Sequence, residues 1–122
     1  MNQEDNLVQS LIQRINHPFE SKDVEYKAPI KWDESDKALC CGIVKDILAM
    51  ANTLGGNLFI GISESPTGYI QEGLTGEQAV TFEASRINRF VNRYADPPIN
   101  VTLRKIPVKD NIFVVIQIPR FT

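Results

Sequence analysis

The segment Ala49-Met50-Ala51-Asn52-Thr53-Leu54-Gly55-Gly56-Asn57-Leu58-Phe59-Ile60-Gly61-Ile62 sets the architecture of this chain. It ends a run of apolar residues that recur on one face of a helix, which we expect to be capped near Ser35. Gly55 and Gly56 can adopt positive φ and therefore end the helix. Residues 57–62 are apolar on both faces and are predicted to form a central strand. The segment therefore predicts a helix, a tight turn and a buried strand.

Hydrophobic periodicity outside this unit predicts further helices and strands. We expect an amphipathic helix over residues 5–16, short strands over 21–26 and 69–71, a helix over 76–94 opened by a Thr75 and Gln78 capping box, and a hairpin of strands 99–106 and 112–118 with its turn at 109–111. This order predicts an α+β fold in which a mixed, largely antiparallel sheet packs with about three helices. The first helix can pack on this domain or on a partner.

The composition is that of one folded domain and excludes disordered, collagen-like and coiled-coil classes. The chain has 122 residues, of which 43% are hydrophobic and 23% charged. Neighbouring side chains point apart in regular structure, so we interpret Cys40 and Cys41 as reduced thiols. The first 20 residues contain no continuous apolar run. We therefore expect no signal peptide, no membrane partner and a cytoplasmic location.

The charge is unevenly distributed along the chain. The net charge is −2, but residues 1–85 hold 6 basic against 13 acidic side chains, whereas residues 86–122 hold 7 against 2. Such an asymmetry is either a solvated surface without further meaning or a carboxylate-rich site beside a phosphate-binding face. The positions of the individual charges decide which interpretation to pursue.

Four charged residues form a candidate catalytic site. Alternation along the predicted strand 21–26 and beyond places Glu25 and Lys27 on one face, and Glu20 precedes them. Glu64 comes just after the buried strand, in an expected loop, and converges with Glu20 and Glu25 if the two strands are neighbours. Such carboxylates can hold Mg²⁺ or Mn²⁺ for phosphodiester cleavage, while the lysine neutralises phosphate charge. The alternative is ordinary surface charge.

A second group of residues is basic and forms a candidate nucleic-acid-binding face. Arg86, Arg89 and Arg93 recur at intervals of a helical turn, and Arg104 with Lys105 is expected to extend the patch from the following strand. Such a row can follow a phosphate backbone. An exposed helix face that is merely soluble has the same pattern, so the two interpretations stay open on spacing alone.

Two motifs resemble the Schlafen AlbA-like domain: residues 20–27 with their Glu-Tyr-Lys, and the Ala-Asn-Thr-x-Gly-Gly run followed by Leu-x-Ile-Gly-Ile in 49–62. The resemblance covers about residues 18–118. It implies an α+β nucleic-acid-binding unit. The active site of the animal Schlafen nucleases consists of three acidic residues. The resemblance implies that Glu20, Glu25 and Glu64 occupy the matching positions in this chain. Family members often have aspartate at the third position and a second acidic residue before it, where this chain has Ser63.

The resemblance also bears on domain organisation. Family members usually continue past the last hydrophobic strand into an Arg-x-Gly-Ser segment, whereas this sequence ends at Ile118-Pro119-Arg120-Phe121-Thr122. We therefore expect residues 1–17 to form an amphipathic helix and residues 18–122 to form a Schlafen AlbA-like domain that is truncated at its C-terminus. The partners implied are the C-terminal domains of a longer protein.

Three functions follow as expectations. The first is a DNA- or RNA-binding module at the N-terminus of a larger regulatory protein, such as a transcriptional regulator, or of a defence protein, with Lys27 and the α-helical arginines on phosphates. The second is an endoribonuclease acting on tRNA-like RNA, with Mg²⁺ or Mn²⁺ held by Glu20, Glu25 and Glu64 beside Lys27. The third is a dimerisation or scaffold module, in which the first helix makes a homodimer contact.

Overall fold

A computed structural model describes residues 2–121, so Met1 and Thr122, the outer bounds of the two predicted domains, lie outside the described residues. The elements in chain order are α1 (Gln3–Asn16), β1 (Val24–Lys27), α2 (Lys37–Ala51), β2 (Gly56–Ile60), β3 (Ile62–Ser65), β4 (Gly68–Gln71), α3 (Gly76–Ala79), α4 (Ala84–Val91), β5 (Thr102–Val108) and β6 (Asn111–Ile118). Four strands form a sheet in the order β1-β2-β6-β5, and β3 pairs with β4 separately. Only β1 and β2 run parallel among these pairs, which confirms a mixed, largely antiparallel α+β fold.

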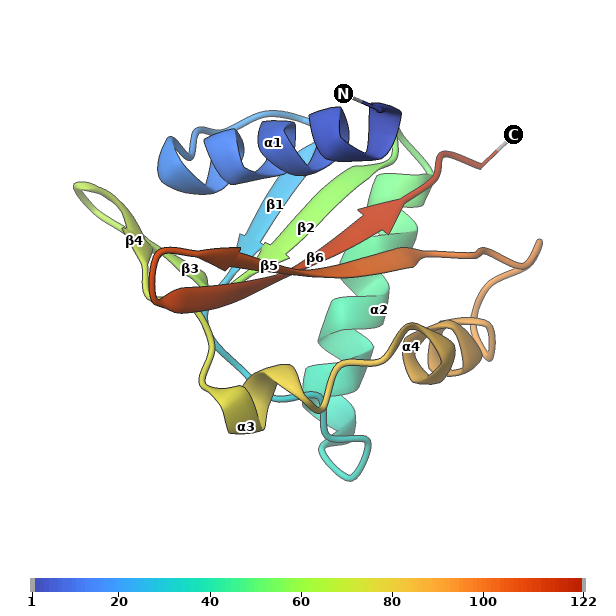
Figure 1. The fold of residues 1–122 in the computed structure, drawn as a ribbon. Helices are drawn as coiled ribbons and strands as arrows, with labels where there is room; N and C mark the ends of the chain where they lie inside the picture. The colour runs from blue at the N-terminus through green and yellow to red at the C-terminus, as the bar shows by residue number, and fades with distance from the viewer. Residues whose placement is uncertain (1, 122) are drawn as a thin grey trace.

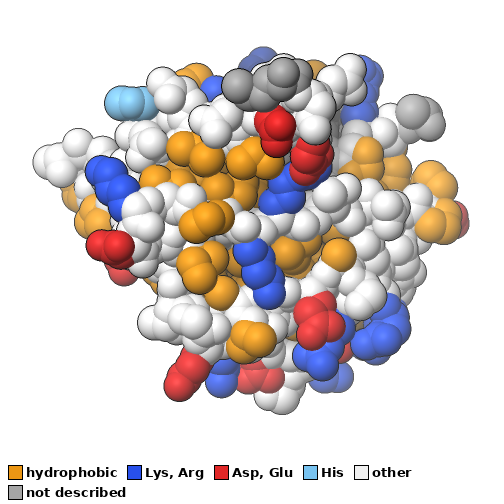
Figure 2. All heavy atoms as spheres, in the orientation of Figure 1, with side chains coloured by type: hydrophobic (Ala, Val, Ile, Leu, Met, Phe, Trp, Pro, Cys, Tyr) orange, Lys and Arg blue, Asp and Glu red, His pale blue; other side chains and the backbone are white. Residues whose placement is uncertain are grey.

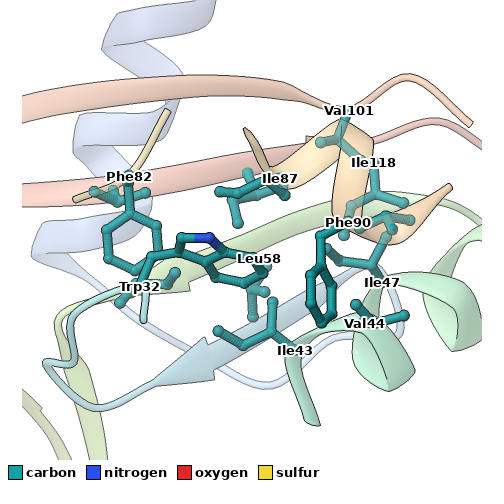
Figure 3. Packing of buried hydrophobic residues seen from close by; sticks show 14 of the residues in the cluster. Trp32, Ile43, Val44, Ile47, Leu58, Phe82, Ile87, Phe90, Val101 and Ile118 are labelled. Atoms are coloured by element: carbon teal, nitrogen blue, oxygen red, sulfur yellow. The ribbon is translucent and has the colours of Figure 1, made fainter. Parts of the chain in front are cut away.

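Helices cover both faces of the four-stranded sheet (Figure 1). The helix α1 lies across one face, where Leu11 and Ile15 are buried with Phe59 of β2. The helices α2, α3 and α4 lie on the other face and enclose the larger core, in which Trp32 and Phe90 pack among aliphatic side chains (Figure 3). The strands β2 and β6 are buried from both sides, as their apolar sequences predict. The first helix therefore packs on its own domain.

The Gly55-Gly56 pair ends α2 and admits a close backbone approach, as expected. The two residues have φ values of 70° and 133°. A Cβ atom on Gly56 would lie 2.0 Å from the carbonyl oxygen of Asp23. That same carbonyl accepts a hydrogen bond of 2.9 Å from the N–H of Asn57. Glycine at position 56 therefore allows the turn before β1 to pack directly against the start of β2.

The central strand is shorter than predicted because Gly61 interrupts it. The prediction of one strand over residues 57–62 was wrong: β2 ends at Ile60, and Ile62 begins β3. Gly61 has a φ of 117°, and a Cβ there would lie 3.0 Å from both the Cα of Gly73 and the ring of Phe113. The chain therefore turns out of the main sheet, and Glu64 lies within β3 rather than in the expected loop.

The predicted helix over residues 76–94 is two helices, which gives four helices in the described part of the chain. The capping box of Thr75 and Gln78 opens α3 as predicted. The break follows because the Thr81 hydroxyl donates to the Gln78 carbonyl at 2.6 Å and accepts from the backbone N–H of Trp32 at 2.8 Å. A side chain that competes for backbone groups in this way ends a helix. Glu83 is then extended and precedes α4.

The starts of several strands and helices also differ from prediction, and α1 begins at Gln3 rather than at residue 5. The N-cap of α2 is Asp36, whose carboxylate accepts from the N–H of Leu39, rather than Ser35. The strand β1 starts at Val24 rather than at residue 21, because residues 21–23 form a turn. The strand β5 starts at Thr102 rather than at residue 99.

The late start of β5 has a specific cause in two asparagine side chains. Asn92 donates to the carbonyl of Ile99 and accepts from its N–H, both at 2.8 Å. Asn88 makes the same pair of bonds to Val101, at 3.0 and 2.7 Å. The backbone groups of residues 99 and 101 are therefore satisfied by helix side chains instead of by a neighbouring strand.

The sequence predicted two reduced cysteines and no membrane-spanning segment. Both cysteines are free, with Cys40 buried and Cys41 exposed. Within residues 2–121, no helix has the length and apolar character needed to cross a bilayer.

Candidate acidic pocket and basic helix face

The three predicted glutamates line one pocket. This pocket has a volume of about 440 Å³, and its walls are formed by Glu20, Ser21, Lys22, Val24, Glu25, Tyr26 and Glu64. The glutamates come from three places in the fold: the segment before β1, the strand β1 and the strand β3. The condition that β1 and the central strand are neighbours is met, because Glu25 of β1 pairs with Leu58 of β2 in the parallel ladder. The fold therefore gathers the acidic residues that the sequence singled out.

Strand alternation sets the directions of the side chains of β1. Tyr26 is buried on the α1 side of the sheet, so Glu25 and Lys27 project from the opposite face of β1, as predicted. The hairpin of β3 and β4 brings in Glu64, which lies opposite Tyr69 in the antiparallel register. The position of Glu64 therefore depends on the break at Gly61.

Aromatic side chains hold the acidic segments together. The hydroxyl of Tyr26 donates a hydrogen bond of 2.8 Å to the carbonyl of Phe19 and accepts one of 3.1 Å from its N–H. The ring of Tyr26 also lies 4.9 Å from the ring of Tyr69 on β4. Tyr26 thus links the residue before Glu20 to the hairpin that carries Glu64.

The pocket raises the proton affinity of one of its carboxylates, Glu25. The pKa of Glu25 is raised above its ordinary value, first because the pocket walls partly desolvate its carboxylate, and then because Asp46, Glu64 and Glu20 are nearby anions. The ammonium of Lys27 opposes this rise in pKa. The pKa of Tyr69 is also raised, by desolvation first and then by Glu20 and Glu64. The pocket is therefore a site of negative potential.

Lys27 was expected to lie beside the glutamates, but its partner in the structure is Asp46. Its ammonium forms an ion pair of 2.9 Å with Asp46 on α2, and both side chains are about one third exposed. The lysine does not line the acidic pocket; it lines a neighbouring one with Ala38 and Leu39. Asp46 was missed in the sequence because it lies on a helix whose face toward β1 could not be assigned from periodicity.

The glutamates do not form a preformed metal site. Among residues 2–121, no three His, Cys, Asp or Glu side chains are arranged to hold one metal ion. All three glutamates are exposed, so their side chains are free to rotate. The assignment of Glu20, Glu25 and Glu64 as ligands of Mg²⁺ or Mn²⁺ therefore stays a prediction.

The three arginines of the second candidate group lie exposed on α4 and the turn after it. Figure 2 shows several basic side chains on the face of the molecule that includes this region. Arg86 is 3.8 Å from the Glu83 carboxylate, a distance at which an exposed pair contributes little. Arg93 lies over the ring of Phe90, with 5.2 Å between its guanidinium carbon and the ring centre. The helix α4 lies on the side of the molecule away from β3 and β4 (Figure 1). The basic face is therefore separate from the acidic pocket.

The expected extension of this face along β5 does not include Arg104. Arg104 and Lys105 are adjacent in a strand, so their side chains leave opposite faces of the sheet. Arg104 lies on the α1 side, where it contacts Glu4 at 3.1 Å and Gln117 at 2.8 Å, and this pairing lowers the pKa of Glu4. Arg104 therefore ties α1 to the sheet instead of joining the arginines of α4.

Fold and sites together define a class: a small α+β domain with an acidic pocket at one edge of its sheet and a basic helix face elsewhere. The family model described as Schlafen, AlbA_2 matches residues 20–122. The chain therefore belongs to the Schlafen AlbA_2 family, as its motifs predicted. The matched region starts after α1, although α1 contributes Leu11 and Ile15 to the core.

Two solved structures share the fold. The N-terminal domain of an ATP-dependent DNA helicase RecG-related protein from Nitrosomonas europaea aligns with a TM-score of 0.54 and 17% identity, over 94% of this chain and 74% of that one. The DIP2311 protein from Corynebacterium diphtheriae aligns with a TM-score of 0.61 and 16% identity, over 98% of this chain and 23% of that one. Identities this low establish a common fold alone. No curated protein matches this chain.

Proposed function

We propose that this chain is a nucleic-acid-binding domain whose α4 face contacts phosphates. The observation that carries the proposal is the row of Arg86, Arg89 and Arg93, all three of which are exposed on α4 and the turn after it. Among the described residues, these three arginines form only one ion pair, the long one between Arg86 and Glu83. Arginines without acidic partners are available to neutralise phosphates and to release the counterions condensed on a nucleic acid.

The comparisons support this proposal at the level of the family. One of the structural neighbours belongs to a protein described as related to a DNA helicase. Because a shared fold does not by itself define a function, the exposed arginines remain the main argument for this chain. We further propose, as the sequence suggested, that the domain is the N-terminal module of a larger cytoplasmic regulatory or defence protein.

Direct binding measurements test the proposal. Fluorescence anisotropy of labelled single-stranded RNA, tRNA and duplex DNA at about 50 mM salt is expected to show binding by the native chain, weakened about fivefold in Arg89→Ala. Lys109→Ala is the matched control, since it removes an exposed cation from the β5–β6 turn, far from α4. Equal affinities for Arg89→Ala and the native chain, or no binding of any probe, would contradict the proposal.

A divalent-metal endonuclease acting on structured RNA is the second candidate function. The convergence of Glu20, Glu25 and Glu64 on one pocket favours it. These carboxylates would hold the ion, which would supply a Lewis acid for phosphodiester hydrolysis. Cleavage of tRNA with Mn²⁺ or Mg²⁺ that chelator and Glu25→Gln both abolish would establish this activity. The matched control is Glu77→Gln, which removes an exposed carboxylate from α3 outside the pocket.

The scaffold function has less support from the structure. Leu11 and Ile15, the buried residues of α1, pack against the chain's own sheet rather than facing outward. A homodimer would therefore need a surface other than the buried side of α1.

A further inference from the structure

An apolar groove lies between α2 and the end of α4. Its volume is about 310 Å³, and it is lined by Cys41, Val44, Lys45, Leu48 and Tyr94. The residues from α2 form one wall, and Tyr94, in the turn after α4, forms the other. Tyr94 is 55% exposed, which is unusual for a large aromatic side chain that already borders the core. The groove is therefore an apolar surface that the described chain leaves open.

The ring of Tyr94 is held in a fixed position from behind. Its centre lies 5.8 Å from that of Phe90, which is 4% exposed and meets Trp32 edge-on at 5.5 Å. Figure 3 shows Phe90 directed into the core beside Val44. The backbone N–H of Tyr94 donates to the carbonyl of Val91 at 2.9 Å, which fixes the turn. Tyr94 is thus a supported aromatic surface with one side facing the groove.

Two cationic side chains lie at or close to this surface. Lys45 is itself part of the groove lining, and Arg93 is adjacent to Tyr94 in the chain and lies over Phe90. Within the described residues, Lys45, Arg89 and Arg93 form no ion pair shorter than 4.0 Å. An apolar groove with positive charge at its rim complements a ligand that combines a flat apolar ring with negative groups.

We propose that this groove receives an unpaired base of a single-stranded nucleic acid, which stacks on Tyr94 while its flanking phosphates contact Lys45 and Arg93. This inference rests on the proposed function and specifies its substrate class. A base within a duplex has both faces covered by its neighbours, whereas an unpaired base offers a free face to an aromatic ring. Stacking needs no base-specific hydrogen bonds, and the largely apolar lining provides few donors or acceptors for them.

Substitution of Tyr94 tests the inference. We expect Tyr94→Ala to weaken binding of a labelled single strand about tenfold, while Tyr94→Phe keeps the affinity, because stacking requires the ring and not the hydroxyl. A single strand containing 2-aminopurine is expected to lose fluorescence on binding to the native chain and to Tyr94→Phe, but not on binding to Tyr94→Ala. Thermal unfolding of each variant verifies that the fold persists.

The same measurements separate this inference from the proposed function. If Arg89→Ala weakens binding but Tyr94→Ala and Tyr94→Phe bind alike, or if the duplex binds as tightly as its single strand, the groove does not take a base although the phosphate-binding face stands. If no nucleic acid binds at low salt, both proposals fail. A native dimer that Tyr94→Ala converts to a monomer would show that a second copy covers the groove, and would also overturn the inference.

Discussion

The hydroxyl of Tyr26 bonds to both backbone groups of Phe19, donating to its carbonyl at 2.8 Å and accepting from its N–H at 3.1 Å. Phe19 immediately precedes Glu20, and Tyr26 immediately follows Glu25. One buried side chain in β1 therefore sets the spacing of two of the three glutamates in the acidic pocket. The tyrosine of the Glu-Tyr-Lys motif thus has a structural role beside the two charged residues that flank it.

Removal of that hydroxyl is expected to weaken the fold. Tyr26→Phe leaves the N–H and the carbonyl of Phe19 without their partner, at a cost of about 1–2 kcal/mol in the free energy of unfolding. Urea denaturation measures this loss. Tyr69→Phe is the matched control, since its hydroxyl bonds to none of the described residues. A loss no larger for Tyr26→Phe than for Tyr69→Phe would contradict the assigned role.

Glycine 56 is expected to be irreplaceable. Gly56→Ala forces a Cβ onto the Asp23 carbonyl at a φ of 133°, and we expect it to lower the free energy of unfolding by at least about 3 kcal/mol. Gly42→Ala, in the middle of α2 with no atom near the new Cβ, is expected to stabilise the protein by about 0.5–1 kcal/mol. Denaturant titrations of the two variants should therefore shift in opposite directions. Similar shifts would mean that the close approach at Gly56 is relaxed in solution.

The helix α1 lies outside the region matched by the family but is expected to be essential to this domain. Leu11 is 3% exposed, so Leu11→Ala should cost about 2–5 kcal/mol of stability. Gln13→Ala, on the exposed side of the same helix, should change the stability by no more than about 0.5 kcal/mol. Thermal unfolding of Leu11→Ala and Gln13→Ala measures the two changes in stability. An unfolding curve for Leu11→Ala that matches the native one would show that α1 detaches from the sheet.

The raised pKa of Glu25 predicts a pH-dependent effect on stability. The ordinary pKa of this carboxyl is 4.5, and the folded state raises it, so ionised Glu25 disfavours folding above the folded pKa and has no such effect below 4.5. Glu25→Gln should therefore stabilise the protein slightly at pH 7, within about 0.5 kcal/mol, and the gain should vanish near pH 3.5. Chemical denaturation at the two pH values measures the difference. A gain that grows on acidification would have the wrong sign.

The parts of the fold that follow from local rules were predictable. The glycine pair at 55–56, the capping box at Thr75 and the continuous apolar run of β6 each carry their physical reason within a few residues. The breaks at Gly61 and Thr81 were not predictable, because both depend on contacts with distant segments. Gly61 turns because of Gly73 and Phe113, and Thr81 leaves the helix because it bonds to the backbone of Trp32.

The sequence identified most of the residues of the candidate sites, but it did not predict how they are arranged in space. Glu20, Glu25 and Glu64 were found by spacing and motif, and they do line one pocket. The ion pair of Lys27 with Asp46 was not foreseen, because it depends on how α2 is oriented against β1. The exposure of Tyr94 was not predictable, because the predicted helix ran to residue 94 and helical periodicity cannot show that α4 ends at Val91.

The salt dependence of nucleic-acid binding tests the central claim most directly. The logarithm of the association constant should fall linearly with the logarithm of the salt concentration, and the slope for a single strand should become shallower by about 2 when Arg86, Arg89 and Arg93 are all changed to Gln. This loss is expected because each arginine that contacts a phosphate releases counterions. An unchanged slope in the triple variant would show that the α4 face does not contact the phosphates and would contradict the account.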